Sequence, residues 1–321
     1  MIGMKKEKIK RNFPDSEFGH VTIPDEGFLY RENGIKEPDS FFRSVIDGET
    51  FTAQPPYDLY SSSAILVRVS DHRILMEKRS GEKVYPASLT KMMTVIIAIE
   101  NICNLQEKVE LPISIFRKLY GENASMAGFK PYERLKVIDL LYGSMLPSGA
   151  ECCIGLAERI ADSEENFVKL MNEKAVELDM NDTHFENVTG LHDRNHYSTA
   201  KDLSFLLCYA LENALFREIF TATQYTVHET NKHPSGTILH STLFKKLKSP
   251  DIENGKILGG KTGYTDEAGL CLASLARKDE DEYILISVGA NGNHKTEQYN
   301  ITDALMVYNS IGKNKIHIRN I

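Results

Sequence analysis

The sequence predicts an α+β fold in which strands from both chain ends form one five-stranded antiparallel sheet. Helices flank this sheet, and a large helical insert separates its first and last strands. Two short β-rich segments lie between residues 63 and 78, and three more follow between residues 256 and 290. The intervening region has a mostly helical pattern to about residue 220. Strands from the two ends can join one sheet, with the helical region packed beside it.

The first two strands are expected to form a hairpin. Ser63–Val69 and Ile74–Lys78 are rich in apolar and β-branched residues, and Ser70–Arg73 between them has the polar composition of a turn. A helix is predicted over Ser88–Asn101, opened by Pro86 and by its own first serine and apolar on much of its surface.

The C-terminal part contains the remaining strands. Within the insert, Thr199–Asp202 has capping-box spacing ahead of the apolar run Leu203–Leu211, which indicates a helix start. Three strands are predicted over Lys256–Thr262, Leu270–Ala276 and Tyr283–Ala290. The acidic segment Lys278–Glu282 is predicted to form the turn before the third strand, and a final helix is predicted over Glu297–Ser310.

The composition is that of an ordinary globular protein. Of the 321 residues, 41% are hydrophobic and 26% are charged, and 38 basic against 45 acidic side chains give a formal charge of −7. The acidic balance argues against a nucleic-acid surface, because phosphate binding requires clustered lysine and arginine. The longest apolar stretch, Val95–Ile99, is far shorter than the ~18 residues that a membrane span needs.

A metal site is not expected from the cysteines and histidines. The five cysteines form neither a CxxC pair nor a Cys/His cluster. Cys152 and Cys153 could be a redox or metal pair, but they fit better as small apolar residues of a buried helix. His192 and His196 have i, i+4 spacing, but they follow Gly190 in a polar segment that favours an exposed loop over a zinc helix.

The two ends of the chain differ from the middle. Residues 1–57 are polar and proline-rich and are expected to form an extended arm before one domain over 58–313, with a tail over 314–321. Met4–Arg11 is basic like the start of a signal peptide, but no apolar segment follows it. The chain as given is therefore expected to carry no export signal; either one was removed with an upstream segment, or the protein stays in the cytoplasm.

Ser88 and Lys91 form an S-x-x-K pattern at the start of the predicted helix. Residues three apart share a helical face, so the amine can approach the hydroxyl. A neutral lysine can take the proton of a serine nucleophile, and burial with a nearby cation such as Lys261 would lower the lysine pKa. The backbone N–H of Ser88 at the helix N-terminus can also receive an oxyanion. Alone, this pattern is most often plain surface helix.

Lys261, Thr262 and Gly263 form a second element, K-T-G. At a strand edge the lysine and threonine side chains could hold a carboxylate, while the glycine lets a ligand approach the backbone closely. Gly255–Thr262 also matches G-x-x-x-x-G-K-T, the pattern of P-loop NTPases. That alternative requires a buried strand before the glycines and a helix after the threonine, whereas the flanking residues predict a turn and a loop.

Ser148 is the third element, in Leu146–Ala150 ahead of a predicted helix over Glu151–Ile160. Its hydroxyl could relay protons near Ser88 and Lys91. The alternative is that it forms the N-cap of the following helix, which alone would justify a serine there. For an isolated match the N-cap is the favoured interpretation.

Together the three elements resemble the penicillin-binding-protein and serine β-lactamase superfamily, which has S-x-x-K, S-x-x and K-T-G in this order. Here they are separated by 60 and 113 residues. The surrounding segments narrow the resemblance to the low-molecular-mass D-alanyl-D-alanine carboxypeptidases: Tyr85–Thr94, Thr183–Leu191, Tyr197–Asp202 and Gly260–Gly269. The resemblance covers residues 60–312 and implies a β-lactamase/transpeptidase-like fold.

The resemblance implies a serine acyl-transfer enzyme that removes the terminal D-alanine from peptidoglycan stem peptides ending in D-Ala-D-Ala. Ser88 would be the acylated nucleophile, Lys91 its base, and Ser148 the group that passes a proton to the departing D-alanine. Water would then hydrolyse the acyl-enzyme without a metal or cofactor. Penicillins, which mimic the D-Ala-D-Ala end, should acylate the same serine.

The resemblance also implies the substrate-binding groups. Lys261 and Thr262, beside Gly263, would bind the terminal carboxylate of the substrate. The oxyanion hole would use the N–H groups of Ser88 and Tyr264. The family works outside the cytoplasmic membrane, and any anchoring would come from an N-terminal segment that this chain lacks. Preference for carboxypeptidase, endopeptidase or transpeptidase chemistry is left open.

The second motif departs from the family at its last position, where Ala150 replaces the usual asparagine. A methyl group cannot hydrogen-bond the substrate amide or orient Lys91, and one lost oriented contact could cost ~2–4 kcal/mol of transition-state stabilisation. A slow enzyme, an enzyme with a substitute polar group and a penicilloyl-binding sensor all fit. Because the other motif residues are retained, we favour a working carboxypeptidase. A β-lactamase of the same fold is an alternative, although no E-x-x-L-N loop is found.

Overall fold

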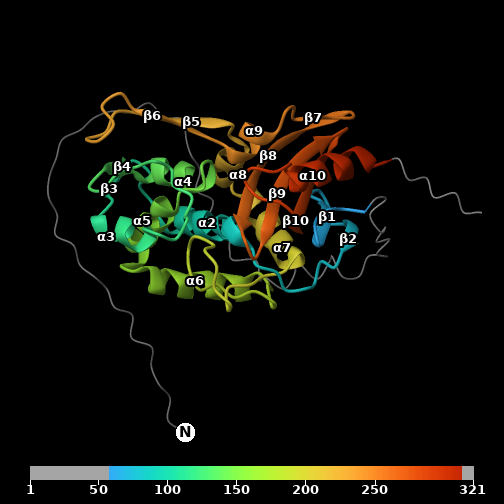
Figure 1. The fold of residues 1–321 in the computed structure, drawn as a ribbon, viewed down its shortest axis with the longest axis horizontal. Coiled ribbons are helices and arrows are strands. Elements are labelled where there is room, and N and C mark those ends of the chain that lie inside the picture. The colour runs from blue at the N-terminus through green and yellow to red at the C-terminus, as the bar shows by residue number, and fades with distance from the viewer. Residues whose placement is uncertain (1–57, 313–321) are drawn as a thin grey trace, which may run out of the picture. The chain divides into compact units, whose positions relative to one another are not determined.

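The computed structural model describes residues 58–312, and their central element is an antiparallel sheet (Figure 1). The strand order is β2-β1-β10-β9-β8-β7, and all neighbours are antiparallel. The strands are β1 (Ser63–Arg68), β2 (Ile74–Lys78), β7 (Asp251–Ile252), β8 (Gly255–Thr265), β9 (Gly269–Lys278) and β10 (Asp281–Ala290). Both chain ends thus contribute to one sheet, and the predicted α+β class is confirmed.

The edge strand β7 adds a sixth strand to the five that the sequence predicts. Its two residues pair with Lys256 and Gly255 of β8. Asn254 in the intervening turn has φ of +57°, a left-handed conformation that asparagine tolerates better than most residues. The polar composition of this segment predicts only a turn, because a two-residue strand leaves no alternation to detect.

Apolar side chains cover the sheet on both faces, because successive residues of a strand point to opposite sides. Ile65 and Val67 of β1 belong to the larger apolar cluster, which extends into the helical insert. Ala64 and Leu66 belong to a second cluster, which contains residues of the C-terminal helix α10 (Tyr299–Ser310). The sheet therefore forms the middle layer between α10 and the insert (Figure 1).

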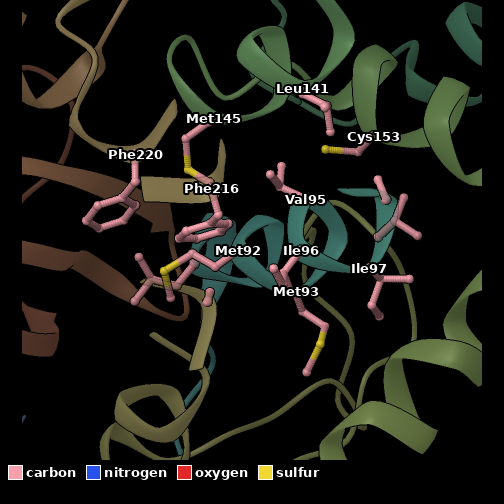
Figure 2. Packing of buried hydrophobic residues seen from close by; sticks show 14 of the residues in the cluster. Met92, Met93, Val95, Ile96, Ile97, Leu141, Met145, Cys153, Phe216 and Phe220 are labelled. Carbon is pink, nitrogen blue, oxygen red and sulfur yellow. The ribbon is translucent and has the colours of Figure 1, made fainter. Parts of the chain in front are cut away.

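Helix α2 (Lys91–Asn101) lies in the centre of the insert, and its first eight residues are all buried. Figure 2 shows its side chains directed toward several neighbouring elements. The neighbours include Leu141 and Met145 of α4 (Val137–Met145), Cys153 of α5 (Ala150–Ala161), and Phe216 and Phe220 of α8 (Ala214–Thr221). A helix that is apolar all round must be enclosed by others. This enclosure fixes the N-terminal end of α2 beside the sheet.

The remaining elements are short or belong to the insert. The helices are α3 (Ile113–Leu119), α4 (Val137–Met145), α5 (Ala150–Ala161), α6 (Glu164–Glu177), α7 (Ala200–Glu212), α8 (Ala214–Thr221) and α9 (Thr242–Lys246). Thr199 caps α7 as predicted, because its Oγ1 accepts the N–H of Asp202 at 2.9 Å. Two small antiparallel pairs were not predicted: β3 (Lys108–Glu110) with β4 (Arg134–Lys136), and β5 (Gln224–Val227) with β6 (Thr237–His240).

The predicted arm over residues 1–57, which includes the basic segment Met4–Arg11, lies outside the described residues, as does the tail over 314–321. The predicted domain limits therefore stay predictions. Within residues 58–312, none of the helices combines the length and apolar character that crossing a membrane requires.

Candidate active site

Ser88 and Lys91 lie where a short 3₁₀ helix, η1 (Ala87–Thr90), continues into α2. Lys91 Nζ donates one hydrogen bond to Ser88 Oγ at 2.9 Å and another to the carbonyl oxygen of Thr189 at 2.7 Å. The predicted helix over Ser88–Asn101 is present, with its first turn tightened into a 3₁₀ helix. The two side chains of the S-x-x-K pattern are thus in direct contact.

The environment of Lys91 favours a neutral amine. The side chain is almost completely buried, and this burial lowers its pKa below the ordinary lysine range. The buried groups of α5, including Cys153 and Glu151, act in the opposite direction. Because only a neutral amine can accept a proton, the burial prepares Lys91 to act as a base toward the Ser88 hydroxyl.

Lys261 is a second buried amine, in the middle of β8. Its Nζ donates hydrogen bonds to Ser148 Oγ and to the carbonyl oxygen of Thr262, both at 2.8 Å. Burial lowers the pKa of Lys261 well below the ordinary lysine range, and the charge of Lys91 lowers it further. Two buried amines that repel each other do not readily hold protons together.

Ser148 is held by Lys261 and does not cap a helix. Helix α5 has Gly149 at its N-cap position, without a side-chain hydrogen bond to the helix. The N-cap interpretation of Ser148 is therefore wrong. The residue has φ of +68°, a conformation that costs free energy for a residue with a side chain. This unusual backbone accompanies a hydroxyl that contacts the K-T-G strand.

Two glycines allow neighbouring segments to pack closely around Ser88. A methyl group at Gly263 of β8 would lie only 3.0 Å from the backbone nitrogen of Ser88. Gly190 has φ of +79°, and a methyl group there would overlap the carbonyl oxygen of Ala87. Glycine is therefore required for steric reasons at Gly190, and it lets the K-T-G strand reach the serine at Gly263.

Thr262 contacts an element that the sequence does not connect with it. Its Oγ1 lies 2.6 Å from the Oγ1 of Thr242, at the start of α9. The backbone N–H of Thr242 in turn donates to the carbonyl oxygen of Leu146, two residues before Ser148. Helix α9 thus links the K-T-G strand to the loop that carries the third motif.

Ser88 and Lys91 open onto a cleft of about 560 Å³. Its walls include Glu122–Ser125, Ala150, Thr189–His192, Tyr264–Glu267 and His294. On the last of these walls, the ring of His294 packs edge-on against Tyr264. A cleft of this volume can hold the end of a short peptide, and a ligand bound in it would lie beside the Ser88 hydroxyl.

The P-loop alternative does not fit the fold. Gly255–Thr262 lies entirely within the extended strand β8, which continues to Thr265 without a following helix. A P-loop instead wraps its glycines around phosphates between a strand and a helix. The NTPase interpretation of this segment is therefore wrong.

The zinc alternative is not supported either. His192 is exposed in a loop, as predicted, but His196 is buried, and this burial lowers its pKa to about 4. The Nδ1 of His196 accepts the N–H of Glu186 at 3.2 Å, so Nε2 carries the proton and donates to Thr90 Oγ1 at 2.8 Å. Among residues 58–312 no group of three or more histidine, cysteine or acidic side chains could hold a metal ion.

The adjacent Cys152 and Cys153 are buried in α5 and form no disulfide, as their interpretation as core residues predicts. Three site contacts were missed by sequence reasoning: the Thr189 carbonyl, the Thr242 hydroxyl and the bond from His196 to Thr90. A backbone carbonyl leaves no residue-specific signal, and the other two contacts depend on tertiary packing. The resemblance of Thr183–Leu191 to the family was the one indication that this segment matters.

Comparisons with known proteins agree with this geometry. A family model described as D-alanyl-D-alanine carboxypeptidase matches residues 49–292. The D-alanyl-D-alanine carboxypeptidase DacF of Bacillus subtilis is 32% identical over 235 residues, which cover 72% of this chain and 58% of DacF. DacC of Escherichia coli is 28% identical over 232 residues, which cover 70% of this chain and 56% of DacC. The chain thus spans less than two thirds of the length of these relatives.

Solved structures share the fold. The Streptomyces K15 DD-transpeptidase is 24% identical with a TM-score of 0.69, covering 79% of this chain and 97% of that one. A D-alanyl-D-alanine carboxypeptidase from Mycobacterium tuberculosis is 21% identical with a TM-score of 0.68, covering 80% and 94%. The transpeptidase-like fold expected from the resemblance is therefore confirmed. Since the family model matches most of its length, this chain belongs to the D-alanyl-D-alanine carboxypeptidase family, peptidase family S11.

Proposed function

We propose that the protein is a serine-type D-alanyl-D-alanine carboxypeptidase, which releases the terminal D-alanine of peptidoglycan stem peptides through an acyl-enzyme on Ser88. One observation carries the proposal. The buried amine of Lys91, with its lowered pKa, contacts the Ser88 hydroxyl at 2.9 Å in a cleft open to a ligand. The D-alanyl-D-alanine carboxypeptidase family to which the chain belongs supports the substrate class.

In the acylation step, neutral Lys91 accepts the Ser88 proton while the serine oxygen forms a bond to the carbonyl carbon between the two D-alanines. The carbonyl oxygen becomes negatively charged, and the N–H groups of Ser88 and Tyr264 would stabilise that charge. Collapse of this intermediate breaks the C–N bond. Ser148 gives its proton to the departing nitrogen and receives in its place the proton that Lys91 took from Ser88, so D-alanine leaves as a free amine and Lys91 is neutral again.

Lys261 and Thr262 would bind the carboxylate of the terminal D-alanine. An arriving carboxylate favours the charged form of Lys261, because opposite charges stabilise each other in a buried site. The charge on Lys261 then disfavours a second proton on Lys91. Substrate binding would thus keep the base neutral, and the two lysines would divide the work of anion binding and proton transfer.

The second half of the reaction regenerates the enzyme. Water attacks the acyl carbon, and its proton passes to the amine of Lys91. The bond from the acyl carbon to Ser88 Oγ then breaks, and Lys91 returns the proton to that oxygen. Penicillins would acylate Ser88 by the same route. The protein would act outside the cytoplasmic membrane on stem peptides, with β-lactams as covalent inhibitors.

Two other outcomes are distinguished by the fate of the acyl group. Because Ala150 cannot supply the usual amide at that position, a sensor that keeps its penicilloyl group and releases little D-alanine is the second candidate. A β-lactamase of the same fold would instead lose its penicilloyl group rapidly.

The test combines intact mass over time after addition of penicillin with D-alanine release from an acylated L-Lys-D-Ala-D-Ala tripeptide. We expect one penicilloyl adduct and measurable D-alanine release, with both abolished in Ser88→Ala. Ser70→Ala, at an exposed turn, is the matched control and should keep both. An adduct that survives in Ser88→Ala, or none in the unmodified protein, would overturn the proposal.

A further inference from the structure

The cleft wall at Ala150 lacks a polar side chain from the second motif, but another segment of the chain lies directly against it. The backbone N–H of Ala150 donates to the carbonyl oxygen of Ser125 at 2.8 Å. A methyl group at Gly149 would lie 2.7 Å from Cβ of Ala127. The segment Glu122–Gly128 therefore packs against the end of the second motif, and its first four residues line the same cleft as Ser88.

The buried carboxylate of Glu151 holds this segment in place. Its Oε1 accepts the backbone N–H groups of Ala127 at 2.8 Å and Gly128 at 3.0 Å. Gly128 has φ of +103° and Asn123 has φ of +50°. Glycine and asparagine are the residue types that accept such conformations at least cost. The wall is thus a defined loop fixed by the residue that follows Ala150.

Asn123 is the side chain of this wall whose chemistry matches the missing asparagine. It is exposed in the cleft and has no hydrogen-bond partner among the described residues. Its amide offers both donors and an acceptor, as a substrate peptide bond requires. Glu122 is only an acceptor when ionised, and its charge would repel the substrate carboxylate. Ser125 has a short side chain, and its backbone carbonyl already binds Ala150.

We propose that the Asn123 side chain binds the peptide amide of the substrate, in place of the asparagine that the family usually has at position 150. This inference rests on the proposed carboxypeptidase function. It makes Asn123 a substrate-binding residue contributed by the Glu122–Gly128 loop, outside the three motifs. It also explains how a chain with Ala150 can keep an oriented hydrogen bond at this wall.

The test measures kcat and KM for D-alanine release from an acylated L-Lys-D-Ala-D-Ala tripeptide. We expect Asn123→Ala to lower kcat/KM about tenfold or more, since it removes an oriented hydrogen bond at the reacting end of the substrate. Met126→Ala, exposed in the same loop but outside the cleft lining, is the matched control and should stay within about threefold. Adding Ala150→Asn to Asn123→Ala should recover most of the loss, because it restores an amide to the same wall.

The outcomes separate this inference from the function on which it rests. If the unmodified protein releases D-alanine and Asn123→Ala stays within about threefold of it, the inference is overturned and the function stands. A loss equal in Asn123→Ala and Met126→Ala, without recovery in the Ala150→Asn double variant, would also overturn it, because it indicates a disturbed loop. If the unmodified protein neither releases D-alanine nor forms a penicilloyl adduct, the proposed function itself fails.

Discussion

Replacing Lys91 with methionine tests the proposed base most directly. The two side chains have similar lengths, but methionine cannot accept the Ser88 proton. Lys261 is not placed to substitute, because its Nζ is bound to Ser148 Oγ and to the Thr262 carbonyl, each at 2.8 Å. General-base catalysis contributes about 10²–10⁴ in rate, which corresponds to ~3–5 kcal/mol in the barrier. We expect the second-order rate of Ser88 acylation to fall by about this factor.

The assay is time-resolved labelling with a fluorescent penicillin over a range of pH. In the unmodified protein the rate should rise with pH as Lys91 loses its proton, with a midpoint below the ordinary lysine range because burial lowers the pKa. The Lys91→Met variant should lack this rise. Lys232→Met, an exposed position, is the control. A labelling rate within about threefold of the unmodified protein, with its pH dependence intact, would refute Lys91 as the base.

The same experiment needs a stability measurement to be decisive. Lys91→Met leaves the Thr189 carbonyl without its donor, which costs ~1–3 kcal/mol if no other group compensates. It also removes the free-energy cost of burying this amine and of removing its proton on folding, and this acts in the opposite direction. Because these effects oppose each other, we expect a folded variant with an unfolding midpoint near that of the unmodified protein. A loss of labelling in such a variant reports on chemistry.

Three further predictions concern the surroundings of the site. Gly190→Ala should lower penicillin labelling about 10²-fold, because the added methyl group overlaps the Ala87 carbonyl and displaces η1. Gly128→Ala is the control, since Gly128 also has a positive φ but has open space around the new methyl group. An equal loss of labelling in Gly128→Ala would contradict this reasoning. The unfolded chain binds more protons than the folded protein between the lowered pKa of His196, about 4, and its ordinary 6.5, so the free energy of unfolding should rise with pH across that window by up to ~3 kcal/mol. Urea titrations should show this rise to be absent in His196→Gln, and an unchanged slope would count against it. Burial raises the pKa of Glu151 from 4.5 to about 6, so ionisation of this carboxyl lowers the free energy of unfolding as pH rises through that range. The free energy of unfolding of Glu151→Gln should therefore exceed that of the unmodified protein by up to ~2 kcal/mol above about pH 7 and by little near pH 4.5. An equal gain at both pH values would rule out the buried charge as the cause.

The large elements can be predicted from the sequence because each one is long enough to show a clear pattern of residue types. The hairpin of β1 and β2, the three long strands β8, β9 and β10, and the capped helix α7 all carry alternation, β-branched residues or a capping box. The pairs β3 with β4 and β5 with β6 have no such signal, since strands of three or four residues are stabilised by their tertiary neighbours. The first turn at Ser88 is a 3₁₀ helix that packs closely against Gly190 and Gly263 of β8, and such long-range contacts leave no local pattern in the sequence.

In the candidate site, contacts between residues close in the sequence could be predicted, whereas contacts between distant segments could not. Spacing alone brings Ser88 and Lys91 together, because both lie on one helical face. The contact between Lys261 and Ser148 spans 113 residues, and only the family resemblance linked them. The N-cap interpretation of Ser148 is wrong because local reasoning cannot detect a φ of +68°, which the surrounding structure imposes. Asn123 carries no motif at all and becomes visible only when its loop is seen against Ala150.

The two buried lysines explain why these motifs have to converge in one place. A single buried lysine would lose its charge and could act as a base, but it could not also attract a carboxylate. The charge of Lys91 lowers the pKa of Lys261, so the two amines do not readily hold protons together. In the proposed mechanism, the carboxylate of an arriving substrate would favour the charge on Lys261 and leave Lys91 neutral. The bond from Lys261 to Ser148 and the bond from Lys91 to Ser88 give each amine its own hydroxyl. In the proposed mechanism Lys91 would transfer the proton and Lys261 would bind the carboxylate, two roles that a single amine could not combine.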